Sequence, residues 1–295
     1  IDTVPIGSEP WEHDPFSGLV KDGKLFGRGS SDMKGGLSAA LSAVKEISAK
    51  SKDLRGDLWL ALTAGEEVDF LGAREVSLFK EEVGSLQVIL LPEPSNNWIF
   101  LAQKGALWLE ITFFGKTAHG SMPQFGINAV QLAVEFLNLF VKADFPSVEH
   151  PLLGRSTSAL TTIRGGIKTN VIPDSCSLTI DMRTVPGQNN DDIHDQVCRL
   201  VDRITKAHPG SRSEVRVLNN AAAVTTPESH PVVEVFSGAV ERATGKSPSI
   251  GGVNYFTDAA ILTPAWDVPM LICGPGKAEL AHQPNEFVEI DRLRA

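Results

Sequence analysis

The sequence lacks several features that point to particular classes of protein. It has no apolar stretch near the roughly 18 residues that a membrane-spanning helix needs, so we expect no membrane partner. It has no run of basic residues and a formal net charge of −9, which argues against nucleic acid as a partner. Its three cysteines, Cys176, Cys198 and Cys273, are scattered and odd in number, which matches neither a disulfide framework nor a CxxC metal site. They favour a reducing compartment, and we expect a cytoplasmic protein.

The length of 295 residues suggests about two domains, and the first third of the chain predicts an α/β layer. Residues 35–50 and 70–83 have apolar side chains at helical spacing, whereas 57–64 and 86–94 are short, continuous apolar runs. Such runs are typical of strands that are buried on both faces of a parallel sheet. We therefore expect a mixed, largely parallel sheet flanked by helices.

The middle of the chain has a different pattern of predicted strands and helices. It predicts four strands, at 106–115, 158–166, 176–184 and 213–219, and two helices, at 128–141 and 191–207. Their β-α-β-β-α-β order is the ferredoxin-like pattern. A helix at 230–245 and a buried strand at 268–276 follow, and they resemble the helices and buried strands predicted in the first third. We expect one catalytic domain formed by 1–103 and 220–295, with an α+β domain inserted at 104–219.

Acidic residues stand where strands end or in glycine-flanked loops, and one histidine follows the last buried strand: Asp2, Asp32, Glu66, Glu67, Glu93 and His282. Each has an ordinary alternative as a turn, helix-cap or solvated surface residue. In an open α/β sheet, however, such positions converge at the carboxyl ends of the strands. Several carboxylates crowd together only with a cation, and carboxylates with one imidazole suit zinc or a similar ion. Of the adjacent Glu66 and Glu67, one can then bind metal while the other acts as general base.

The motifs resemble those of a known family in the family's order: "IDTVP", "GRGSSDMKGG", "TAGEE", "PEPS", "GKTAHGSMP", "GGIKTNVIPD…DMRTVPG" and "GPGKAELAHQPNE". That family is the co-catalytic zinc peptidases and deacylases, which includes aminoacylase, acetylornithine deacetylase, succinyl-diaminopimelate desuccinylase and carboxypeptidase G-type enzymes. The resemblance extends over essentially the whole chain. It implies that the inserted domain is a lid and dimerisation domain.

The resemblance also implies roles for particular residues. Two divalent ions, zinc with cobalt or manganese as alternatives, are expected to share Asp32. Glu93 is expected to bind one ion and Glu67 with His282 the other, while Glu66 serves as general base. Asp2 matches the aspartate of the family's HxD motif, whose histidine falls immediately before Ile1, so we expect an N-terminally truncated chain. The peptide bond Asp32–Met33 is expected to be cis.

Four further positions are expected to contact the substrate or the developing charge. The family's lid histidine, here His119, reaches the partner's active site in a homodimer and stabilises the oxyanion. The planar guanidinium of Arg183 can donate two parallel hydrogen bonds to a substrate carboxylate. Asn170 matches a position that also reaches the site, and Gly252 lies where the pocket wall forms.

The expected activity is hydrolysis of the amide bond of a small N-acyl amino acid, by a deacetylase or desuccinylase of amino-acid metabolism. A carboxypeptidase or dipeptidase of the same family is the first alternative. A binding relative without catalysis is the second, although the complete acidic set argues against it.

Overall fold

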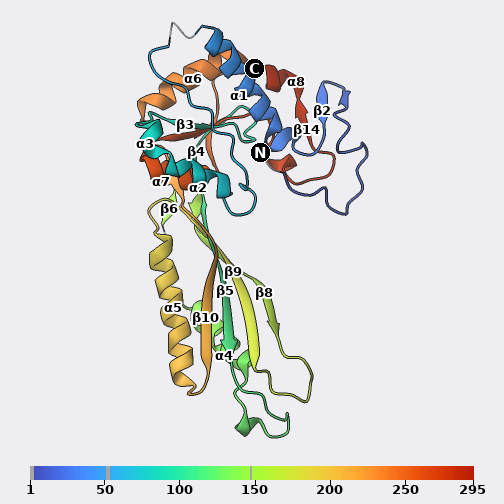
Figure 1. Cartoon of the computed structure of the whole chain (residues 1–295), viewed down its shortest axis with the longest axis vertical. Helices are drawn as coiled ribbons and strands as arrows, with labels where there is room; N and C mark the ends of the chain where they lie inside the picture. The colour runs from blue at the N-terminus through green and yellow to red at the C-terminus, as the bar shows by residue number, and fades with distance from the viewer. Residues whose placement is uncertain (1–2, 51–53, 147) are drawn as a thin grey trace. The chain divides into compact units, whose positions relative to one another are not determined.

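The protein divides into two compact units, each described here by itself (Figure 1). The computed structural model describes residues 3–50, 54–146 and 148–295. The first unit combines the chain up to Gln103 with Val224–Ala295, and the second is Lys104–Ala223. The second unit ends at Ala223 rather than at 219 because its last strand continues to Ala221.

The first unit has a mixed five-stranded sheet with helices around it (Figure 1). Its strands are β3 (Ile89–Leu91), β4 (Ile99–Gln103), β11 (Val224–Thr225), β12 (Ile250–Val253) and β13 (Met270–Ile272). The pairings β12–β4 and β13–β3 are parallel, whereas β11–β4 and β13–β4 are antiparallel. The mixed α/β sheet is as predicted, and the antiparallel pairings are as numerous as the parallel ones.

The rest of this unit consists of helices and a separate small sheet. The helices are α1 (Gly35–Ala49), α2 (Leu71–Leu78), α3 (Lys80–Val83), α6 (Pro231–Thr244), α7 (Ala259–Trp266) and α8 (Ile290–Arg294). A separate three-stranded sheet is formed by β1 (Val20–Lys21), β2 (Lys24–Phe26) and β14 (Phe287–Glu289). The helix predicted at 70–83 is interrupted at Phe79, so it becomes α2 and α3.

The buried strand predicted at 57–64 is wrong. These residues form neither strand nor helix, and Leu58, Trp59, Leu60 and Leu62 are half exposed. An apolar run becomes a strand only when another strand accepts and donates its main-chain hydrogen bonds. No strand of the described chain pairs with this run.

The second unit has the predicted β-α-β-β-α-β order. Its main elements are β5 (Gly105–Phe114), α4 (Ala129–Phe140), β8 (Thr157–Gly165), β9 (Ser175–Thr184), α5 (Asn190–Ala207) and β10 (Arg212–Ala221). A hairpin of β6 (Glu149–His150) and β7 (Gly154–Arg155) lies between α4 and β8. The four long strands form an antiparallel sheet in the order β10-β5-β9-β8.

One face of this sheet and the two helices enclose the core of the second unit. Alternate residues of β5 and β9, including Phe113 and Ile180, are buried against Phe136 of α4 and Val197 of α5. The side chains of Asn128 and Asn189 cap the starts of α4 and α5 by accepting main-chain N–H bonds. The edge strand β8 stays exposed along its whole length.

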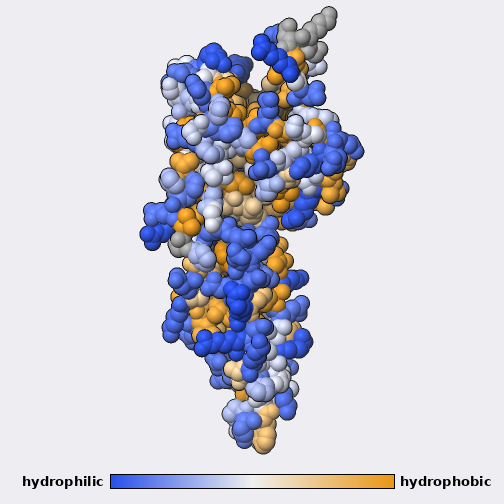
Figure 2. All heavy atoms as spheres, turned by 90° about the vertical axis from the view of Figure 1, so that its left-hand side faces the viewer, coloured by the Kyte–Doolittle hydropathy of each residue, from blue (hydrophilic) through white to orange (hydrophobic). Residues whose placement is uncertain are grey.

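No helix in the described parts of the chain is both long and apolar enough to cross a bilayer. On the face that Figure 2 displays, hydrophobic residues are interspersed with hydrophilic ones.

Candidate functional site

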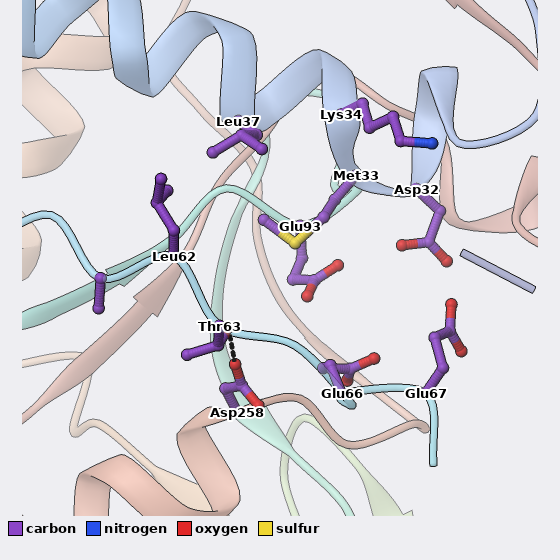
Figure 3. A pocket seen from close by; sticks show the side chains of 11 residues that line it. Asp32, Met33, Lys34, Leu37, Leu62, Thr63, Glu66, Glu67, Glu93 and Asp258 are labelled. Atoms are coloured by element: carbon purple, nitrogen blue, oxygen red, sulfur yellow. Dashed lines mark hydrogen bonds between the residues drawn. The ribbon is translucent and has the colours of Figure 1, made fainter. Parts of the chain in front are cut away.

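Four loops of the first unit bring the predicted acids and histidine together. Asp32 lies in the turn Ser30–Lys34 that leads into α1, and Glu93 follows β3. Glu66 and Glu67 precede α2, and His282 follows β13. Asp32, Glu66, Glu67 and Glu93 line one pocket with side chains from the same unit (Figure 3).

Three of these side chains lie close enough together to hold one metal ion. Asp32, Glu67 and His282 each offer a ligand atom, and the three atoms lie within 4.8 Å of one another. Nε2 of His282 is 3.1 Å from Oε1 of Glu67 and 3.5 Å from Oδ2 of Asp32. Two carboxylates and one imidazole are a ligand set that zinc accepts. The predicted ligands therefore meet in space although 250 residues separate Asp32 from His282 in the sequence.

Crowding and burial disfavour the ionised forms of Asp32 and Glu93. Burial, and next the charge of Glu67, raises the pKa of Asp32 from its ordinary 3.8 to about 6. Glu93 is only 5% exposed. Burial raises its pKa well above the ordinary value, and the charges of Glu66 and Asp32 raise it further. A divalent cation among these groups favours the ionised carboxylates, so the residues present fit the metal that the motifs imply.

Glu66 and Glu67 diverge because of a turn and not, as expected, because of an extended strand end. Gly65 has a φ of 82°, and its carbonyl accepts hydrogen bonds from the N–H groups of Val68, Asp69 and Phe70. In Figure 3, Glu67 points toward Asp32, whereas Glu66 lies beside Glu93. The two neighbours thus face different groups of the pocket.

Glu286 supports the site and is a residue to which the sequence analysis assigned no role. It is fully buried, and its carboxylate accepts hydrogen bonds from the N–H groups of Gly29, Ser31 and Asp32. Arg28 pairs with the same carboxylate at 2.7 Å. Glu286 therefore fixes the main chain that carries Asp32. Its place in the quoted "AHQPNE" motif was the only available signal.

Comparison with known proteins gives the family. The model of peptidase family M20/M25/M40 matches residues 1–295. The chain belongs to this family.

Two curated M20 relatives resemble the chain over nearly its full length. A probable succinyl-diaminopimelate desuccinylase of Staphylococcus aureus is 28% identical over 99% of this chain and 77% of its own length. An acetylornithine deacetylase of Proteus mirabilis is 30% identical over 98% of this chain and 73% of its own length. The crystal structure of an M20 family metallo-carboxypeptidase from Sulfolobus solfataricus has the same fold, with a TM-score of 0.72. It is 18% identical over 96% of this chain and 78% of that one.

The remaining predicted residues of this M20 chain fall in three places. Asp2 lies outside the described residues. Gly252 lies on β12, where it pairs with Ala102 of β4. His119, Asn170 and Arg183 all belong to the second unit. The peptide bond Asp32–Met33 is cis, as expected from the family.

His119 and Asn170 are neighbours. The N–H of Gly120 donates to the carbonyl of Asn170 at 2.8 Å, and His119 forms a β-bridge with Val171. Both loops adjoin one end of the sheet, where Phe114 of β5 pairs with Ser175 of β9.

Arg183 lies at the other end of that sheet. It pairs with Ala106 of β5 and Thr157 of β8, and its guanidinium donates to both carboxylate oxygens of Asp181 at 2.8 and 3.0 Å. Arg183 is eight residues along β9 from Ser175, so at about 3.3 Å per residue roughly 26 Å separates Arg183 from the end near His119. The second unit does not bring these two residues together.

Proposed function

We propose that the protein hydrolyses the amide bond of a small N-acyl amino acid with the help of two divalent metal ions. The observation that carries this proposal is the convergence of Asp32, Glu67 and His282, with Glu66 and Glu93 lining the same pocket. The named relatives, a desuccinylase and a deacetylase, act on substrates of this class.

The side chains of the pocket have two kinds of role, metal binding and proton transfer. Asp32 would hold both ions, Glu93 would complete one ligand set, and Glu67 with His282 would complete the other. Bound zinc supplies Lewis acidity, which polarises the amide carbonyl and makes water a better nucleophile at neutral pH. Glu66 accepts the proton of the attacking water and passes it to the nitrogen of the leaving amine.

His119 donates a hydrogen bond to the oxyanion that forms at the carbonyl. Its tautomer supports this role, because the N–H of Ser121 donates to Nδ1 of His119 at 3.2 Å. A main-chain N–H can only donate, so Nδ1 is the acceptor and the neutral ring carries its proton on Nε2. Nε2–H is therefore the donor that His119 offers to a ligand.

Activity requires a homodimer in which His119 and Asn170 come from one subunit and Arg183 from the other. The roughly 26 Å between the two ends of the sheet supports this arrangement, since one copy of the unit cannot deliver both to a small substrate. Arg183 binds the substrate carboxylate, and Gly252 forms part of the pocket wall. The exposed edge strand β8 is a suitable surface for pairing with a second copy. The free thiols Cys176, Cys198 and Cys273 accord with a cytoplasmic location.

A substrate panel tests the proposal. N-acetyl and N-succinyl amino acids and dipeptides are incubated with the protein in zinc or cobalt, and with chelator as the control. We expect turnover of at least one N-acyl amino acid, its loss on chelation and its return with metal. Turnover of dipeptides alone favours the carboxypeptidase or dipeptidase alternative, which the family's range leaves open. Metal binding without any turnover identifies a non-catalytic relative.

A further inference from the structure

Asp258 is a buried acid of the same pocket that has no part in the scheme above. It directly precedes α7 and is 7% exposed. Its Oδ2 accepts a hydrogen bond from Oγ1 of Thr63 at 2.5 Å (Figure 3). This is at the short end of the range for hydrogen bonds between a hydroxyl and a carboxylate.

Thr63 stands three residues before Glu66, at the end of the segment 57–64. That segment has no strand partner in the described chain. Hydrogen bonds to a neighbouring strand therefore do not fix the chain where it leads into the turn that carries Glu66 and Glu67. After Thr63, the carbonyl of Ala64 accepts from the N–H of Gly72, and Gly65 closes the turn. The bond to Asp258 thus ties the N-terminal side of this turn to α7, 195 residues away in sequence.

We propose that Asp258 is a positioning residue that acts through Thr63 to hold the turn carrying Glu66 and Glu67. The inference rests on the proposed function, in which Glu66 must come within hydrogen-bonding distance of the attacking water. A misplacement of about 1 Å in such a site lowers the rate by ~10²-fold. Fixing the turn to a helix of the same unit keeps the carboxylate of Glu66 in reach.

Three variants separate this role from a general effect on stability. Thr63→Val keeps the shape and removes the hydroxyl, whereas Thr63→Ser keeps a hydroxyl that can donate to Asp258. Thr263→Val is the matched control, because Oγ1 of Thr263 on α7 is buried and has no hydrogen-bond partner among the described residues. Each variant is assayed with saturating zinc, and its bound zinc and melting temperature are measured.

We expect Thr63→Val to lower kcat by about 10- to 100-fold with little change in KM. Thr63→Ser should restore most of kcat, and Thr263→Val should leave it unchanged. An Asp258→Asn variant weakens the same bond, so the double variant Thr63→Val/Asp258→Asn should lose no more than the worse single variant. Wild-type kcat in Thr63→Val, or equal losses in Thr63→Val and Thr263→Val, overturns the positioning role.

Hydrogen exchange provides a readout that is independent of turnover. The N–H groups of Val68, Asp69 and Phe70 donate to Gly65, so their exchange reports opening of the turn. Thr63→Val should accelerate their exchange while α6 and the second unit stay unchanged, and Thr263→Val should not. If the wild type turns over no amide, the proposed function fails while this exchange difference still supports the tether. If exchange is unchanged in Thr63→Val, the tether itself is wrong.

Discussion

Replacing Glu66 with glutamine tests the central chemical assignment. Glutamine keeps the size and shape of the side chain but cannot accept a proton from water. A general base contributes typically 10²–10⁴-fold to the rate, which corresponds to ~3–5 kcal/mol of transition-state stabilisation. We expect kcat of Glu66→Gln to fall by this factor while bound zinc stays near the wild-type amount.

The neighbouring substitution should have the opposite profile. Glu67 contacts His282 at 3.1 Å within the triad of ligand atoms, so Glu67→Gln removes a charged ligand. We expect it to lower the zinc content at limiting metal, and excess zinc should recover part of the activity. Glu75→Gln, on the exposed surface of α2, controls for the loss of one negative charge and should behave as wild type.

Steady-state kinetics and metal analysis by mass spectrometry on the same samples distinguish a general base at Glu66 from a metal ligand at Glu67. A Glu66→Gln enzyme that keeps most of its activity removes Glu66 from the mechanism. Loss of zinc to the same extent in Glu66→Gln and Glu67→Gln makes both residues ligands and leaves the base unassigned.

Three further predictions concern the dimer, the substrate and the metal-free state. Mixing inactive His119→Ala with inactive Glu66→Gln should recover activity toward half of wild type per mixed dimer, and no recovery after verified subunit exchange excludes action in trans. Arg183→Ala should raise KM for carboxylate substrates far more than for the matching amides; equal effects reject the anchoring role. In metal-free protein, the pKa of Asp32 is raised from 3.8 to about 6, so the folded state binds this proton more tightly than the unfolded chain. Its melting temperature should therefore fall as pH rises from about 4 to 6, and Asp32→Asn should flatten that fall; an unaltered slope contradicts the shift.

The convergence of Asp32, Glu67 and His282 could be anticipated from the sequence because each of them belongs to a short motif with its own local signal. Asp32 stands among glycine and serine before a helix, and His282 follows the last buried strand. A rule about strand ends was enough to suggest that such loops meet. The β-α-β-β-α-β order of the second unit was predictable for the same reason, since each element has a clear period of its own.

The features that the sequence did not predict depend on partners that are distant in the sequence. The segment 57–64 has the composition of a buried strand, but its conformation depends on whether another strand lies beside it. The functions of Glu286 and Asp258 likewise depend on which donors lie near them in space. Local patterns contain no information about those donors, so neither role could be assigned, although Glu286 lies within one of the quoted motifs.

The contacts of the carboxylates now separate two classes of acid in this site. Glu286 accepts bonds from three main-chain N–H groups and from Arg28, and Asp258 accepts one from Thr63. These donors fix the loops that carry the other acids. Asp32 and Glu93 are instead raised in pKa by burial and by neighbouring acids, an arrangement that favours a bound cation. Acids that face donors therefore fix the loops, and acids that face one another are the candidates for holding a metal, so a motif that contains both kinds cannot be interpreted from residue types alone.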